Sequence, residues 1–190
     1  MLRSRRRDEM TIRPNSGQEA TPSVRHLAHL VVLAWVSMLG TDLLLHAGVL
    51  AWLYARPTPF LLDPATAFNR IPIGYASFLV LATLLAVLSV RLGVRDWKEG
   101  LRFGLLLGTA VWAALTMGLA SISTASGPLL LGWFVGQTVE LGLGGAVVGG
   151  GLQGVRPRRL WMLVVVWCVF AFGTTVLMQN LGLAPAAVVR

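Results

Sequence analysis

The sequence predicts an all-α integral membrane protein with about five transmembrane helices, the N-terminus inside and the C-terminus outside. Hydrophobic residues make up 55% of the 190 residues and charged residues only 13%, whereas ordinary soluble domains carry about 25% charged residues. Five apolar runs are long enough to cross the roughly 30 Å hydrocarbon core of a bilayer as helices. Basic residues alternate between the connections, which supports both the helix count and the orientation.

The predicted helices cover residues 30–54, 71–90, 103–122, 128–151 and 160–182. The second, third and fifth runs contain no charged residue. The first is interrupted only by Asp42 and His46, and the fourth only by Glu140. Glycines near Gly149 blur one boundary, so four or six spans are the alternatives. The single cysteine, Cys168, excludes a disulfide framework and a cysteine-rich metal site.

The orientation follows from the distribution of lysine and arginine. Thirteen of the 16 basic residues lie before the first run or in the second and fourth connections. Because short positive segments stay in the cytoplasm, we expect a basic, disordered cytoplasmic tail at 1–26, a single membrane domain at 27–184 and a short outer tail at 185–190. The expected location is the cell inner membrane, with several passes.

The tail and the connections carry weaker signals. The tail lacks the interleaved aromatic residues that stack on bases, so we expect the lipid bilayer and not nucleic acid as its partner. Asp63 and Pro64 predict one short helical turn in the outer connection. The inner connection at 91–102 suits an amphipathic turn in the membrane interface. Aromatic residues are expected near the interfaces, and on the outer side these are Trp52, Tyr54, Tyr75 and Trp133.

Small residues recur every four positions on two of the predicted helices. The fourth helix carries one such row around Glu140 and a second pair beside it: Gly132, Gly136 and Gly144, then Gly145 and Gly149. The third carries a row at Gly104, Gly108, Trp112, Thr116 and Ala120. Such rows let helix backbones approach closely in lipid. Because only residues 123–127 connect these helices, we expect the two rows to face each other or to converge on a shared cavity.

The ionisable residues within the runs are the candidate site. Asp42 and Glu140 lie at the centres of their predicted helices, and His46 lies about 6 Å from Asp42 at 1.5 Å rise per residue. A carboxylate in hydrocarbon costs about 2.5–3.5 kcal/mol, so such residues face a partner or a water-filled cavity. The residues that we expect to share one site for an ion, a proton or a substrate are Asp42, His46, Gln137, Glu140, Trp112 and Thr116.

Two buried carboxylates cannot both ionise cheaply at close range, so we expect one of them to hold a proton. His46 can carry the other charge or exchange a proton within the group. The alternative is a neutral hydrogen-bonded clasp between helices.

Three functions follow as hypotheses. The first is the handling of a proton, cation or small polar solute across the membrane, which makes use of the costly carboxylates. The second is an accessory or assembly subunit, in a homo-oligomer or a larger membrane complex, with the glycine rows as partner surfaces. The third is a metal-dependent membrane enzyme, because Asp, His and Glu can supply three ligands. The pattern favours a non-enzymatic protein without a cofactor or bound metal.

Overall fold

The computed structural model describes residues 22–55 and 58–185, and all regular secondary structure in this part of the chain is helical, with no strands. Its elements are α1 (Val24–Leu44), a π-helical turn η1 (Leu45–Val49), a 3-10 turn η2 (Ala51–Leu53), α2 (Pro64–Arg91), α3 (Trp97–Ile122), α4 (Gly127–Leu152) and α5 (Pro157–Asn180). Five helices in this part are long and apolar enough to cross a membrane. The prediction of a multi-pass helical membrane protein is confirmed at this level.

Two helices begin earlier than predicted because acidic residues cap them. Asp63 accepts a hydrogen bond from the backbone N–H of Thr66 at 3.0 Å, and α2 begins directly after it. Hydrogen bonds from Thr66 also lower the pKa of the Asp63 carboxyl. Asp63 and Pro64 therefore start the whole of α2 and not the single short turn that we expected.

Asp96 acts in the same way at α3. Its carboxylate accepts from the backbone N–H groups of Lys98 and Glu99 at 2.7 and 2.9 Å. Residues 97–102, which we expected in a separate interfacial turn, form the first turns of α3. The apolar runs mark the hydrocarbon-compatible part of each helix, whereas the caps mark where the helix itself starts.

The first helix differs most from the prediction. It begins at Val24, after Ser23 caps it, and its regular part ends at Leu44 instead of residue 54. The chain then widens into the π turn, in which the Leu50 N–H bonds to the Leu45 carbonyl at 2.6 Å. Asp42 consequently lies near the end of α1 and not at its centre, while Glu140 is central in α4. Most of the predicted tail at 1–26, and the residues from 186 on, lie outside the described residues.

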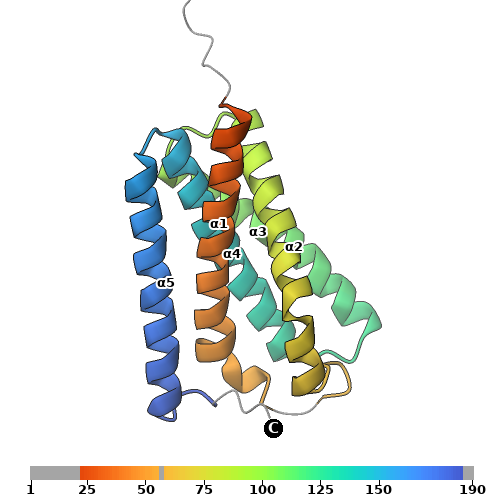
Figure 1. Ribbon diagram of the computed structural model, residues 1–190. Helices are drawn as coiled ribbons and strands as arrows, with labels where there is room; N and C mark the ends of the chain where they lie inside the picture. Colours follow the sequence, from red (N-terminus) through yellow and green to blue (C-terminus); the bar gives the residue numbers. More distant parts are fainter. Residues whose placement is uncertain (1–21, 56–57, 186–190) are drawn as a thin grey trace, which may run out of the picture.

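Helix α1 is the centre of the bundle. It packs against α2, α4 and α5, while α3 lies mainly along α4 on the far side (Figure 1). One apolar core joins α1, α2 and α4 through buried residues that include Met38, Leu85 and Leu141. A second core joins α1 to α5 through Leu33 and Val164. Many other apolar side chains on α2, α3 and α5 are exposed, as expected for helices that face lipid.

The glycines of α3 and α4 bring the two backbones into contact. A Cβ atom on Gly104 would collide with the carbonyl oxygen of Leu141, and one on Gly145 with the carbonyl oxygen of Gly100. A Cβ atom on Gly149 would collide with the Asp96 carbonyl oxygen, and one on Gly108 would lie 2.8 Å from the Thr138 Cα atom, which is also too close. Close approach of backbones across small residues is a usual way for helices to associate in lipid.

The expected pairing of the two glycine rows is wrong in one respect. Gly132 and Gly136 face side chains of the turns that follow α1, and Gly144 faces side chains of α1 and α2, so none of the three faces α3. It is the second pair, Gly145 and Gly149, that faces α3. Each residue turns the helix by about 100°, so a row that begins at Gly145 points to a different neighbour from one that includes Gly144.

Candidate functional site

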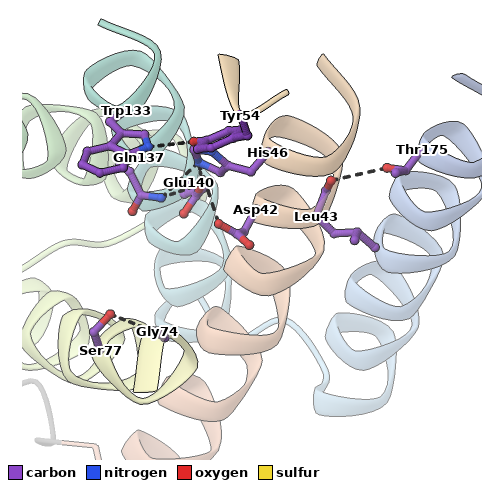
Figure 2. A network of polar contacts seen from close by, with 10 residues as sticks. All are labelled: Asp42, Leu43, His46, Tyr54, Gly74, Ser77, Trp133, Gln137, Glu140 and Thr175. Atoms are coloured by element: carbon purple, nitrogen blue, oxygen red, sulfur yellow. Dashed lines mark hydrogen bonds and ion pairs between the residues drawn. The ribbon is translucent and has the colours of Figure 1, made fainter. Parts of the chain in front are cut away.

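His46 lies among polar side chains contributed by α1, the turns after it and α4 (Figure 2). Its Nε2 atom is 3.8 Å from Asp42 Oδ1 and 3.5 Å from Glu140 Oε1. The amide nitrogen of Gln137 is 3.3 Å from the same Nε2 atom and donates to Glu140 Oε1 at 3.1 Å. The structure thus brings together four of the six residues for which the sequence suggests a shared site.

The other ring nitrogen of His46 contacts an aromatic pair. Nδ1 is 2.5 Å from the Tyr54 hydroxyl, which also accepts a hydrogen bond from Trp133 Nε1 at 2.7 Å. Burial raises the pKa of the Tyr54 phenol, so its hydroxyl keeps its hydrogen at neutral pH. We refer to these six residues as the histidine cluster: Asp42, His46, Tyr54, Trp133, Gln137 and Glu140.

The members of the cluster differ in exposure. The Glu140 side chain is fully buried, whereas 24% of Asp42 and 17% of His46 remain exposed. Within the described residues, Glu140 Oε2 has no hydrogen-bond partner. An ionised carboxylate with an unpaired oxygen is costly in such a place. The arrangement therefore favours a proton or a cation on Glu140.

Local structure explains how these side chains meet. Trp133, Gln137 and Glu140 are spaced four and three residues apart, so they share one face of α4. Gly136 lies on the same side, and a Cβ atom there would be 3.4 Å from His46 Nε2. The missing side chain thus makes room for the imidazole. The π turn carries His46, and such turns occur frequently at functional sites.

Trp112 and Thr116 are not joined to the cluster by any hydrogen bond found among the described residues. The Trp112 indole packs against the apolar core, and its N–H group is buried without a partner. The Thr116 hydroxyl bonds back to the Trp112 carbonyl at 2.6 Å. Both follow the glycine row of α3, and that row faces a different side of α4 from Glu140.

The roles of Tyr54 and Trp133 were not predicted from the sequence, in which both residues fit the aromatic residues of the outer interface. Tyr54 reaches His46 because the π and 3-10 turns fold the chain back within eight residues. The hydropathy pattern shows no sign of these turns. One signal was available, since Trp133 precedes Gln137 by four residues and helical spacing places the two on one face.

The hydrogen bonds allow two positions for the imidazole proton. With the proton on Nδ1, the ring donates to the Tyr54 oxygen, and Nε2 accepts from the Gln137 amide. With the proton on Nε2, the ring faces Glu140 and Asp42 as a donor, and Tyr54 donates to Nδ1. Each ring nitrogen has partners for both states. The imidazole can therefore connect the Tyr54 hydroxyl to the carboxylates by changing tautomer.

No known protein family, curated protein or solved structure matches this chain.

Proposed function

We propose that the protein binds a proton in the histidine cluster and passes it across the membrane in which its five helices lie. We place it in the cell inner membrane with the N-terminus inside, as the distribution of basic residues predicts. The observation that carries the proposal is the position of His46 between the Tyr54 hydroxyl and the fully buried Glu140 carboxylate. Intramembrane groups of this kind mark proton relays and ion pathways.

The relay runs from Tyr54 through His46 to the carboxylates. A proton taken up at Nδ1 leaves a second proton on Nε2 free to move to Glu140 or Asp42, at 3.5 and 3.8 Å. When Nε2 loses that proton, the ring returns to a neutral state and the carboxylate is neutralised. The step needs only small shifts, since hydrogen bonds for transfer are about 2.6–3.2 Å long.

An apolar layer lies on one side of the cluster. Toward the start of α1, the interior of the bundle holds fully buried apolar side chains that include Met38, Leu85 and Leu141. A proton that crosses the whole membrane therefore needs water to enter this apolar layer. We expect both that step and transfer at His46 to contribute to the rate of flux.

Proton flux into proteoliposomes tests the proposal. We expect the full-length protein to acidify vesicles that hold a pH-sensitive dye when a potassium diffusion potential drives proton entry. Glu140→Gln keeps the size and hydrogen-bonding capacity of the side chain but cannot ionise, so its flux should fall to that of empty vesicles.

Glu99→Gln is the matched control, because Glu99 is an exposed acidic residue at the start of α3, outside the cluster. Its flux should equal that of the wild type. Flux through the wild type no greater than through empty vesicles would overturn the proposal, as would unchanged flux in Glu140→Gln.

A metal site is the second candidate, and one observation favours it. Asp42, His46 and Glu140 each offer a ligand atom, and these atoms all lie within 4.8 Å of one another. Tetrahedral zinc with bonds of about 2.0–2.1 Å places its ligand atoms about 3.3 Å apart, close to the 3.5 and 3.8 Å found here. A Tyr54 hydroxyl on Nδ1 would fix the ring orientation, as outer partners of metal-bound histidines do.

The metal could serve a membrane enzyme with an open ligand position. Elemental analysis of protein purified without chelators distinguishes this role from the relay. A stoichiometric metal that is lost in Asp42→Ala would favour the enzyme, whereas metal-free protein with proton flux favours the relay.

A further inference from the structure

A groove between α4 and α5 lies outside the histidine cluster and has no role in the proposed relay. Its volume is about 780 Å³, within the range of sites for small organic ligands. Small and apolar residues line most of it, including Ala146, Gly150, Leu163 and Val164. Trp167 lies at one end and Arg159 at the other, eight residues apart on α5. At 1.5 Å rise per residue, these two residues are about 12 Å apart along α5, which gives the length of the groove.

The groove exists because α5 packs more closely against α1 than against α4. Leu160 and Val164 of α5 pack with Leu30 and Leu33 of α1 in one buried cluster. On the α4 side, a Cβ atom on Gly150 would meet only Leu160 and Trp97, at ordinary contact distances of 3.7 and 3.9 Å. The small side chains of α4 thus leave space beside α5 that no side chain among the described residues fills.

The mouth of the groove is strongly basic. Arg159 lines both the groove and a second hollow next to it, which Arg156 and Arg158 also line. All three arginines are exposed. Both ion pairs found in the described part of the chain belong to His46, so none of these guanidinium groups pairs with an acidic side chain there. Arginines at one end of an apolar groove complement a molecule with a negative head and a hydrocarbon tail.

We propose that this groove binds one anionic phospholipid, with an acyl chain along α4 and α5 and the phosphate at Arg156, Arg158 and Arg159. The connection from α4 to α5 lies at the end of the bundle where α1 begins (Figure 1), and Arg156, Arg158 and Arg159 belong to this connection and the first turn of α5. The charge distribution places this end on the cytoplasmic side. The lipid fills the space that α4 leaves beside α5 and neutralises the basic connection. This inference does not depend on the function of the histidine cluster.

Native mass spectrometry of the full-length protein tests the proposal. Protein in mixed micelles of phosphatidylglycerol and phosphatidylcholine should retain one phosphatidylglycerol in preference to phosphatidylcholine. Arg158→Gln/Arg159→Gln should lower that preference about tenfold or more, because each basic residue contributes about 1 kcal/mol of attraction. Arg91→Gln/Arg95→Gln is the matched control at the same end of the bundle, and its preference should equal that of the wild type.

A second variant tests the groove itself. Gly150→Leu fills the space without a backbone collision, so we expect it to lose the retained lipid. Gly173→Leu is its control, because a Cβ atom at this exposed glycine of α5 meets nothing within 4 Å. Acyl-brominated phosphatidylglycerol should quench tryptophan fluorescence less in Gly150→Leu than in Gly173→Leu.

Equal lipid preference in the wild type and Arg158→Gln/Arg159→Gln would overturn the proposal. An equal loss in both arginine pairs would also overturn it, because that result indicates general attraction to an anionic surface. Retention of the lipid in Gly150→Leu, with unchanged quenching, would show that the acyl chain lies elsewhere.

Discussion

Helix α4 has two faces that use glycine for different purposes. Toward α3, Gly145 and Gly149 lie directly against backbone atoms, so the contact is made by the main chains themselves. Toward α1, Gly136 lies beside the imidazole of His46, between the polar side chains of Gln137 and Trp133. One glycine-rich helix therefore supports a tight packing interface on one side and a polar site on the other.

The comparison teaches that glycine spacing alone does not identify what a helix face does. On the α3 side, an added methyl group has no room because a carbonyl oxygen occupies the space. On the α1 side, the nearest atoms belong to side chains, which can shift or exchange protons. Substitutions on the first face should change stability, whereas on the second face those beside His46 should change function.

The largest expected effect is on proton flux. His46→Gln keeps hydrogen-bonding groups but has no group that takes up a proton, so flux should fall about 100-fold, the lower range for loss of a proton-transfer group. His29→Gln is the control, because His29 lies on α1 outside the cluster and also contacts an aromatic side chain: its Nε2 atom accepts a hydrogen bond from Trp161 Nε1 at 2.9 Å. The measurement is dye-detected flux in proteoliposomes. Equal flux in the two variants would show that the face of α4 beside His46 has no role in proton transfer.

The next effect is on stability. Gly104→Ala forces α3 and α4 apart, because its methyl group would collide with the Leu141 carbonyl. We expect the free energy of unfolding to fall by about 2 kcal/mol, as for overpacked sites. Gly118→Ala lies on the same helix with nothing within 4 Å of its Cβ atom, and it should not be destabilised. Denaturant titration in micelles measures the free energy of unfolding of both variants. Equal values for Gly104→Ala and Gly118→Ala would show that close contact between α3 and α4 does not stabilise the protein.

A smaller effect should distinguish two glycines of one row on α4, Gly136 beside His46 and Gly144 beside Met38. Gly136→Ala places a methyl group 3.4 Å from His46 Nε2 and should reduce flux about three- to tenfold by displacing the ring. Gly144→Ala instead meets the flexible Met38 side chain at 3.1 Å. It should leave flux unchanged. A greater loss of flux in Gly144→Ala would mean that packing, and not ring position, controls transfer.

The smallest effect concerns two half-buried tryptophans, Trp112 and Trp133. Trp133→Phe removes a hydrogen bond to the Tyr54 hydroxyl and should lower the free energy of unfolding by about 1 kcal/mol more than Trp112→Phe. The Trp112 N–H is buried and has no hydrogen-bond partner among the described residues, so its loss removes none of the hydrogen bonds seen there. Thermal unfolding of the two variants side by side measures the difference. The reverse order would indicate that Trp112 takes part in an unrecognised polar contact.

Much of the fold was predictable because hydropathy and charge act over whole helices. Five apolar runs predicted five helices, and this prediction is confirmed. The ends of the helices were not predictable from apolar runs, since Asp63 and Asp96 extend α2 and α3 by capping. Local hydrogen bonds decide these boundaries, and they are independent of hydropathy.

The residues of the candidate site were predictable only in part. The cost of charge in hydrocarbon singled out Asp42 and Glu140, and helical spacing added His46 and Gln137. Tyr54 depends on an irregular turn that leaves no periodic signal. Trp112 was predicted to join the site because it lies on the row of small residues of α3. Such a row indicates that a neighbouring helix lies close, but it does not indicate which face of that helix it meets.

The π turn at Leu45–Val49 makes the length of this segment critical. Such a turn contains one residue more than a regular helix needs, so deletion of a single residue here would restore an unbroken α-helix. Everything after it would rotate by about 100° and shift by about 1.5 Å. Tyr54 would leave its place beside His46, although every side chain of the site would still be present. A one-residue deletion in this segment therefore tests the position of Tyr54 separately from the chemistry of its side chain, which a substitution cannot do.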